Sequence, residues 1–215
     1  ILFLDRAVGR GDFGRLGEAA EWLARWQRRF PPRIEKPTLA IFAGSHGIVE
    51  QGVSLSSNSD TRAHIDALAQ GRAPLSAIAA QAGATVRVFE LALDRPTPSI
   101  AKEAAMTERE CAATIAYGFE AVEDKPDLLA IAVSGAGVGT AAAAVACALY
   151  GGSPDYWVRP SAQTPASLSE KRSTLVSDAL RLHRGHLSDP LDALRCLGGR
   201  ELAACVGAII AARQQ

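Results

Sequence analysis

The residues best suited to binding an anion form a glycine-rich loop at 134–140, Ser-Gly-Ala-Gly-Val-Gly-Thr. The apolar run at 128–133 before it is too short for a helix and rich enough in branched residues for a buried strand. Residues 141–150 after it are mostly alanine, which favours a helix. In such a strand, turn and helix, free N–H groups and the helix dipole point at one place. We therefore expect a phosphate-bearing ligand here; the alternative is a turn whose small residues serve only packing.

The same loop fits the dinucleotide fingerprint G-x-G-x-x-G/A through Gly137, Gly139 and Ala142. That fingerprint also requires an acidic residue about 20 positions later, at the end of a second strand, to hold a ribose hydroxyl. Asp155 stands near this spacing, but the Gly-Gly-Ser-Pro at 151–154 before it does not predict a strand. An NAD(P)-binding Rossmann protein is therefore kept as an alternative.

A second polar turn, Gly-Ser-His-Gly at 44–47, follows another apolar run at 38–43. Open α/β sheets bind ligands in such loops, at the carboxyl ends of their strands. His46 is thus a candidate acid–base group or ligand contact. A lone histidine at least as often only holds its loop by hydrogen bonds, so the sequence leaves both roles open.

Strands and helices alternate along the chain and would position these loops. Apolar runs predict strands at 38–43, 85–91 and 128–133. We expect a parallel sheet whose last strand is 128–133 or a short one near 156–158, with the loops after residues 43 and 133 on one edge. Apolar spacing and capping signals predict helices near 15–30, 60–70, 74–81, 107–122, 141–150, 167–183, 189–197 and 201–213. Three sites are expected to cap helices, namely Asp60, Thr107 with Glu110, and Ser167 with Glu170.

The composition limits the class of protein. A chain of 215 residues suits one domain with a small appendage. Its 23 basic and 23 acidic residues give a formal net charge of zero, so nothing favours nucleic acid or an anionic membrane as a partner. The apolar run at 1–4 is far short of a signal or membrane segment. We therefore expect neither a nucleic-acid nor a membrane partner.

The four cysteines show no C-x-x-C or zinc spacing and mostly lie in apolar helical runs. They are typical of reduced core residues in a cytoplasmic protein. His183 and His186 have no evident third ligand, so we expect no metal site there.

An ordered set of short motifs is more specific than the glycine loop alone. The set comprises Gly-Asp-Phe-Gly-Arg-Leu at 11–16, Ile-Phe-Ala-Gly-Ser-His-Gly at 41–47, Gly-Val-Ser at 52–54, Gln-Ala-Gly-Ala at 81–84, Ala-Met-Thr at 105–107, Gly-Val-Gly at 137–139, His-Arg-Gly-His-Leu at 183–187, Asp-Pro-Leu at 189–191 and Gly-Gly-Arg-Glu at 198–201. In these motifs the sequence resembles the nicotinate-nucleotide–dimethylbenzimidazole phosphoribosyltransferases of cobalamin lower-ligand synthesis.

The resemblance implies a Rossmann-like parallel sheet flanked by helices. It implies an N-terminal helical appendage at 1–36, an α/β nucleotide-binding core at 37–215, and a homodimer. The implied reaction transfers phosphoribose from nicotinate mononucleotide to 5,6-dimethylbenzimidazole, giving α-ribazole phosphate and nicotinate without a metal. The implied partners are therefore a small-molecule nucleotide and an aromatic base.

Carried over position by position, the resemblance also assigns roles to residues. Ser54 would line the pocket for the aromatic base. The glycine loop would grip the nucleotide, helped by Lys171 and the turn at 198–199. The positions assigned to substrate binding are Ser54, His46, Gly137, Gly139, Thr140, Lys171, Gly198, Gly199 and Glu201.

The reaction also needs a general base within about 3 Å of the azole proton, directly or through one water. The resemblance places the family's catalytic glutamate beyond Gln215, together with the C-terminal part of the family fold. Within 1–215 the candidate bases are His46, Glu50 and Glu201, and none matches a desolvated carboxylate beside the base pocket. We therefore expect residues 1–215 alone to form no α-ribazole phosphate above background.

The chain departs from the family pattern in several loops. The family's central loop reads Gly-Glu-Met-Gly-Ile-Gly-Asn-Thr-Thr, and Gly135 stands in place of the glutamate. The family's Tyr-Pro shortly after Gly-Val-Ser is replaced by serines at 56–57, and its Gly-Thr-Gly nucleotide loop is replaced around 160–162. Ser45 stands where Asp or Asn is usual. A further alternative is therefore a non-catalytic relative that binds a nucleotide or pairs with an active paralogue.

Overall fold

The computed structural model describes residues 14–160 and 164–215. The packing of the backbone divides the chain into two compact units, Ile1–Glu35 and Lys36–Gln215. In the described part of the first unit, α2 (Arg15–Gln27) ends three residues earlier than expected, because Arg28 turns out of the helix with a φ of 49°. The motif residues at 11–13 and the replaced loop at 161–162 lie outside the described residues. The helical appendage at 1–36 stays a prediction.

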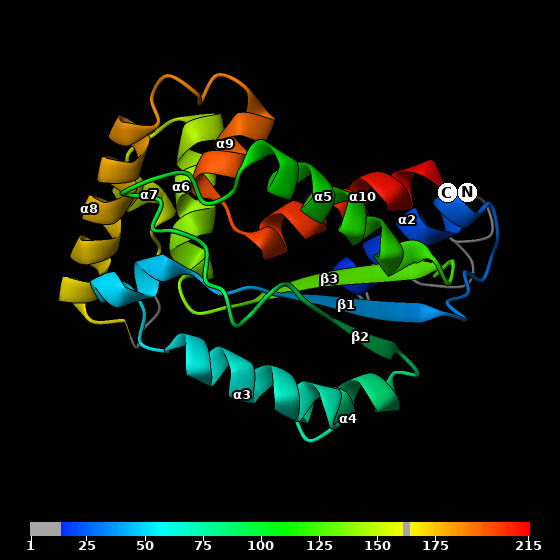
Figure 1. Cartoon of the computed structure of the whole chain (residues 1–215). Helices are drawn as coiled ribbons and strands as arrows, with labels where there is room; N and C mark the ends of the chain where they lie inside the picture. Colours follow the sequence, from blue (N-terminus) through cyan, green and yellow to red (C-terminus); the bar gives the residue numbers. More distant parts are fainter. Residues whose placement is uncertain (1–13, 161–163) are drawn as a thin grey trace. The chain divides into compact units, whose positions relative to one another are not determined.

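The second unit is built around a parallel sheet in which β1 (Pro37–Ala43) lies between β2 (Thr85–Glu90) and β3 (Leu128–Ser134) (Figure 1). Both pairings are parallel, which confirms the predicted α/β fold. Ala43 is level with the last residue of β2 on one side and of β3 on the other. The Gly44 N–H also donates to the Ser134 carbonyl at 3.0 Å. The loops after residues 43 and 133 therefore leave the same edge of the sheet, as predicted.

Helices cover both faces of this sheet because β1 alternates its apolar side chains between them. One face is covered by α3 and α4 (Figure 1), and there Ile41 packs with Ile65 of α3. On the other, Phe42 stacks on Phe89 at 4.9 Å beneath α5 and α10. The described helices of this unit are η1 (Gly47–Gln51), α3 (Asn58–Ala69), α4 (Pro74–Gln81), α5 (Glu108–Gly118), η2 (Phe119–Val122), α6 (Val138–Tyr150), α7 (Pro154–Trp157), α8 (Ala166–Leu182), α9 (Pro190–Leu197) and α10 (Arg200–Gln214).

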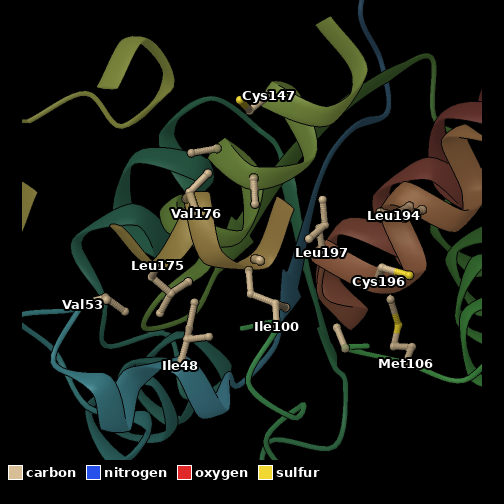
Figure 2. Close-up of a cluster of buried hydrophobic side chains, with 14 of the residues drawn as sticks. Ile48, Val53, Ile100, Met106, Cys147, Leu175, Val176, Leu194, Cys196 and Leu197 are labelled. Carbon is tan, nitrogen blue, oxygen red and sulfur yellow. The ribbon is translucent and has the colours of Figure 1, made fainter. Parts of the chain in front are cut away.

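The largest apolar cluster lies past the carboxyl ends of the strands, among α6, α8 and α9 (Figures 1 and 2). Val176 from α8 and Leu197 from α9 are completely buried in it. Ile48 from η1 and Ile100 from the loop after β2 reach the same cluster and are also completely buried. The loops at the carboxyl edge of the sheet therefore rest on a packed apolar base.

Of the two places predicted for the last strand, the structure has the one at 128–133. Tyr156 and Trp157 lie in the short helix α7, because Pro154 at the first helical position starts a turn. Two predicted caps were wrong. Helix α8 begins at Ala166 after Pro165, and no side chain caps it, so Ser167 is not its cap.

The cap of α3 also differs from the prediction. Ser57 is the N-cap, and its hydroxyl accepts from the Asp60 N–H while the Asp60 carboxylate accepts from the Ser57 N–H at 2.7 Å. Asp60 is thus the third residue of a capping box, and the helix begins two residues before it.

Helices α5 and α10 cross at very short range because each contributes a glycine to the contact. A Cβ placed on Gly118 would lie 2.0 Å from the Ala204 carbonyl oxygen, and one on Gly207 would lie 1.8 Å from the Ile115 carbonyl oxygen. Neither glycine has a positive φ, so the requirement is for space rather than for backbone freedom. Gly118 and Gly207 therefore set how closely α5 and α10 approach each other.

The predicted capping box at Thr107 and Glu110 is present, and it allows a test of the start of α5. The Thr107 hydroxyl accepts from the Glu110 N–H at 3.2 Å, and the Glu110 carboxylate accepts from the Thr107 N–H at 2.8 Å. Thr107→Ala is expected to lower the free energy of unfolding by about 1 kcal/mol. Urea unfolding measures the change; an unchanged midpoint would contradict a stabilising cap.

The capping box also predicts a dependence on pH. The backbone hydrogen bond from Thr107, followed by that from its hydroxyl, lowers the pKa of Glu110 below its usual value. A lowered pKa stabilises the fold above the unfolded-state pKa, and this stabilisation is lost as the pH falls through the folded-state pKa. The difference between wild type and Thr107→Ala should therefore shrink in acid.

Among the described residues, no helix is both long enough and apolar enough to cross a membrane.

Candidate functional site

The turn at 44–47 is held from two sides by hydrogen bonds to its backbone. On one side, the Thr97 N–H donates to the Ser45 carbonyl at 2.9 Å, and the Gly47 N–H donates to the Thr97 carbonyl at 2.8 Å. On the other, the Asn58 side chain donates to the His46 carbonyl at 3.2 Å and accepts from the His46 N–H at 3.4 Å. These four hydrogen bonds fix the turn in position and leave the His46 ring available for other contacts.

The His46 side chain forms a buried pair with Glu201 in the first turn of α10. Its Nε2 lies 2.9 Å from Glu201 Oε1, and the two side chains are 1% and 0% exposed. Nδ1 of His46 and Oε2 of Glu201 have no hydrogen-bond partner among the described residues. The pair is therefore closed to solvent, and each side chain keeps one polar atom that no described residue hydrogen-bonds.

Two glycines make room for this pair, and a third allows the turn after β3 to approach the turn after β1. A Cβ on Gly44 would lie 1.9 Å from Glu201 Oε2, and a Cβ on Gly199 would lie 2.4 Å from both Glu201 Oε1 and the His46 ring. A Cβ on Gly135 would lie 2.5 Å from the Gly44 carbonyl oxygen. The turn after β1 and the turn before α10 therefore meet around one buried carboxylate, and the turn after β3 packs on the turn after β1. Gly198 stands apart from the pair, since a Cβ there would meet the Leu194 carbonyl oxygen at 2.5 Å.

The glycine loop at 135–137 leads into α6. Gly137 caps the helix with a φ of 87°, a conformation that glycine adopts without strain. A Cβ on Gly139 would meet nothing within 4 Å, so the first turn is open on that side. Thr140 is buried, and its hydroxyl has no partner among the described residues. The arrangement agrees with an anion site at the helix start.

Ser54 lines a cleft of about 240 Å³ between α3 and the end of β3. The α3 hydroxyl of Thr61 accepts from the Ala136 N–H at 2.9 Å and so joins α3 to the glycine loop. The cleft and the start of α6 adjoin at Ala136. The residues that line the cleft are Ser54, Ser56, Asp60, Thr61, His64, Ser134, Gly135 and Ala136.

Lys171 lies on α8 and lines a different cavity of about 460 Å³, together with Gln51 and Val53. The neighbouring Arg172 donates through Nε to the Val53 carbonyl at 2.7 Å, which anchors the segment 52–54 to α8. Residues 53 and 54 thus line different cavities. The structure brings His46, Glu201 and Gly199 together. Lys171 lines the cavity of about 460 Å³ and not the Ser54 cleft.

The described residues contain no group of three histidine, cysteine or acidic side chains that could hold a metal ion. His183 Nε2 lies 2.9 Å from the Ile100 carbonyl oxygen, which gives it a structural partner. All four cysteines are free thiols. Burial, together with the charge of nearby Glu201, raises the pKa of Cys205 to about 12, so this thiol is unreactive at neutral pH.

Sequence reasoning missed Asn58, Thr61 and Thr97 as the residues that hold the two loops. Asn58 and Thr61 lie in the first turns of α3, where the predicted start at Asp60 had left Asn58 in a loop. A serine followed three residues later by an acidic residue was the available signal, and it marks Ser57 as the cap. Thr97 lies in a segment without a periodic pattern, so no sequence signal marked it.

The comparisons with known proteins agree with this fold and identify a family. The nicotinate-nucleotide–dimethylbenzimidazole phosphoribosyltransferase of Sinorhizobium fredii (strain NBRC 101917 / NGR234) is 46% identical over 205 residues, which are 95% of this chain and 60% of that protein. The protein of the same name from Brucella canis (strain ATCC 23365 / NCTC 10854 / RM-666) is 43% identical over the same shares. A family model described as Phosphoribosyltransferase matches residues 5–215. The chain belongs to the nicotinate-nucleotide–dimethylbenzimidazole phosphoribosyltransferase family.

A solved member of this phosphoribosyltransferase family has the same fold. The crystal structure of the enzyme from Thermus thermophilus superposes with a TM-score of 0.87 at 28% identity, over 99% of this chain and 69% of that chain. The predicted α/β class is thereby confirmed. The chain spans 60% of the length of the curated relatives that it matches.

Proposed function

We propose that the protein carrying this chain transfers phosphoribose from nicotinate mononucleotide to 5,6-dimethylbenzimidazole, forming α-ribazole phosphate and releasing nicotinate. The observation that supports this most directly is the 46% identity over 205 residues with an enzyme named for these two substrates. The substrate-binding roles of Ser54, Lys171 and the other assigned residues are part of the same proposal.

Two neighbouring sites at the carboxyl edge of the sheet could bind the two reactants: the start of α6 the phosphate, and the Ser54 cleft the aromatic base. The glycine loop presents the start of α6, where backbone N–H groups and the helix dipole stabilise a phosphate. The Ser54 cleft begins at Ala136, one residue before the Gly137 cap, so a base held there would adjoin the ribosyl phosphate. Holding both reactants in this way supplies proximity, which lowers the barrier to transfer.

The buried pair is suited to support rather than to direct contact with substrate. His46 and Glu201 are closed to solvent, and each is the other's hydrogen-bond partner. We propose that they act by fixing the turns at 44 and 199 around the site. The resemblance instead assigns His46 and Glu201 to substrate binding, and a structure with a bound nucleotide would distinguish the two roles.

Among the described residues, the structure does not have the second strand that the dinucleotide alternative requires before its acidic residue. The fingerprint needs a strand before its acidic residue, and Asp155 lies instead in the four-residue helix α7. We therefore expect nicotinate mononucleotide to bind the protein more tightly than NAD. Isothermal titration calorimetry with both ligands measures the order, and tighter binding of NAD would restore the dinucleotide interpretation.

Catalysis is tested on the product of the complete reading frame that contains this chain. Incubation with nicotinate mononucleotide and dimethylbenzimidazole should yield α-ribazole phosphate and nicotinate in equal amounts by liquid chromatography. Binding of the mononucleotide without product would favour the alternative of a non-catalytic relative. The absence of both binding and product would refute the proposed function.

We further propose that the protein is a cytoplasmic homodimer, as the family resemblance implies, and that 1–36 forms a helical appendage. In the described part of this segment, Trp22 and Trp26 are 58% and 73% exposed on α2. Exposed aromatic residues one turn apart provide an apolar stripe that requires a partner surface.

A further inference from the structure

We propose that Thr61 is a positioning residue of the transfer: its hydroxyl holds the glycine loop so that the start of α6 binds the phosphate of the nucleotide. This inference rests on the proposed function, because the phosphate meets this loop only if a phosphoribosyl donor binds there. The free N–H groups of the loop, the buried hydrogen bond from the loop to Thr61 and the anchoring of Thr61 on α3 each support it.

The start of α6 offers two N–H groups to a ligand. In the described part of the chain, the N–H groups of Gly137 and Gly139 have no hydrogen-bond partner. Between them, the Val138 N–H donates to the Gly135 carbonyl at 3.2 Å and closes the turn before the helix. Gly139 is exposed and Gly137 is half-buried, so a ligand can reach both N–H groups. A phosphate bound at this helix start would accept hydrogen bonds from both of them.

The direction of these N–H groups depends on the peptide before Gly137, which Thr61 holds. The Ala136 N–H donates to Thr61 Oγ1 at 2.9 Å, and both residues are 5% exposed. A buried N–H without an acceptor is costly, so loss of the hydroxyl favours a loop in which this N–H turns toward another acceptor. The N–H groups of Gly137 and Gly139 would turn with it.

Thr61 is itself fixed because it lies one turn after the N-cap of α3. Its hydroxyl donates to the Ser57 carbonyl at 3.4 Å, and its N–H donates to the same carbonyl at 3.2 Å. The capping box with Asp60 holds Ser57 in turn. The same end of α3 also holds the turn after β1, since the Asn58 side chain both donates to and accepts from the His46 backbone. The start of α3 therefore sets the position of both loops at the carboxyl edge.

The other contacts of the glycine loop lie before Ala136 and leave this role to Thr61. The Gly44 N–H donates to the Ser134 carbonyl at 3.0 Å, where β3 ends, and Gly135 lies against the Gly44 carbonyl. Among the described residues, Thr61 provides the one hydrogen bond from a side chain to the backbone at 135–137. A hydroxyl suits this place because it accepts one hydrogen bond while it donates another.

The test measures how much the phosphate adds to the affinity for the donor. The protein of the complete reading frame is titrated by calorimetry with nicotinate mononucleotide and with nicotinate riboside, which lacks the phosphate. No acceptor base is present, because Thr61 also lines the Ser54 cleft. We expect the wild type to bind the mononucleotide about 100-fold more tightly than the riboside, as for two hydrogen bonds to a charged group.

Thr61→Val removes the hydroxyl with little change of shape, and it should lower this affinity ratio about tenfold, as for the loss of one hydrogen bond to a charged group. Thr61→Ser keeps the hydroxyl and should keep the ratio near the wild-type value. Thr85→Val is the matched control, since it makes the same exchange at an exposed position at the start of β2, and it should leave the ratio unchanged. Thermal unfolding checks each variant, and Thr61→Ala, with the same expected fall, replaces Thr61→Val if that variant does not fold.

A ratio that Thr61→Val leaves unchanged would overturn this inference. Equal losses of affinity for both ligands would also overturn it, because a residue that only stabilises the fold affects both alike. The same holds for a wild type that binds both ligands equally, since the phosphate then gains nothing from the loop. In each of these cases, formation of α-ribazole phosphate by the wild type leaves the proposed function standing. The absence of both mononucleotide binding and product would overturn the proposed function and this inference with it.

Discussion

Replacing Glu201 by alanine is expected to lower the free energy of unfolding by about 1–3 kcal/mol. The carboxylate is fully buried, and its Oε1 lies 2.9 Å from His46 Nε2, so its loss leaves a buried ring nitrogen without its hydrogen-bond partner. Its removal also leaves a cavity between the turns at 44 and 199, whose backbones pack against it. Urea unfolding followed by circular dichroism measures the loss.

The matched control is Glu103→Ala, which removes an exposed carboxylate and should change the unfolding free energy by less than about 0.5 kcal/mol. A double-mutant cycle with His46→Ala isolates the pair and should give a coupling of about 0.5–3 kcal/mol. Two outcomes would contradict a mutually dependent buried pair. One is that the losses in unfolding free energy of the two single variants add up to that of the double variant; the other is a loss below about 1 kcal/mol for Glu201→Ala.

Gly207→Ala should destabilise the protein by about 1–2 kcal/mol, even though alanine is the better helix former. Alanine gains about 1 kcal/mol in helix propensity. Against this, its Cβ would lie 1.8 Å from the Ile115 carbonyl oxygen, which belongs to backbone and cannot rotate away. Helices α5 and α10 must therefore separate, and overpacking of this kind typically costs about 1–3 kcal/mol and occasionally more.

Gly185→Ala serves as the control for this substitution. A Cβ there would meet nothing within 4 Å, and the residue has no positive φ, so the midpoint of thermal unfolding should stay nearly constant. If Gly207→Ala unfolds at the same temperature as Gly185→Ala, the close crossing of α5 and α10 is wrong.

The sheet could be predicted from sequence because its signals are local. The apolar run at 128–133 is uninterrupted, and the observed strand differs from it by one residue. The expectation that this strand is buried was wrong, because none of its residues is buried. The capping box at Thr107 and Glu110 is likewise a relation between residues three apart, and both of its hydrogen bonds are present. Predictions failed where local signals competed, as at the start of α3, where both Ser57 and Asp60 are cap-forming residue types and Ser57 is the observed N-cap.

The candidate site could be predicted only in part because it is made by contacts between distant segments. The positions of His46 and Glu201 were identified as candidates, but nothing local indicates that they pair with each other. Their pairing depends on the approach of α10, which the glycines at 118 and 207 set, and on the room that Gly44 and Gly199 leave. Contacts of this kind follow from the fold as a whole and leave no periodic pattern in the sequence.

The pairing of His46 with Glu201 also has a consequence for synthesis on the ribosome. The two residues are separated by 155 positions. At about 5–20 residues per second, the ribosome needs about 8–30 s after adding His46 before Glu201 is added. The turn after β1 spends this interval without the carboxylate that later fills the space beside Gly44. The site is therefore completed late in translation, after the three strands that carry it have already been made.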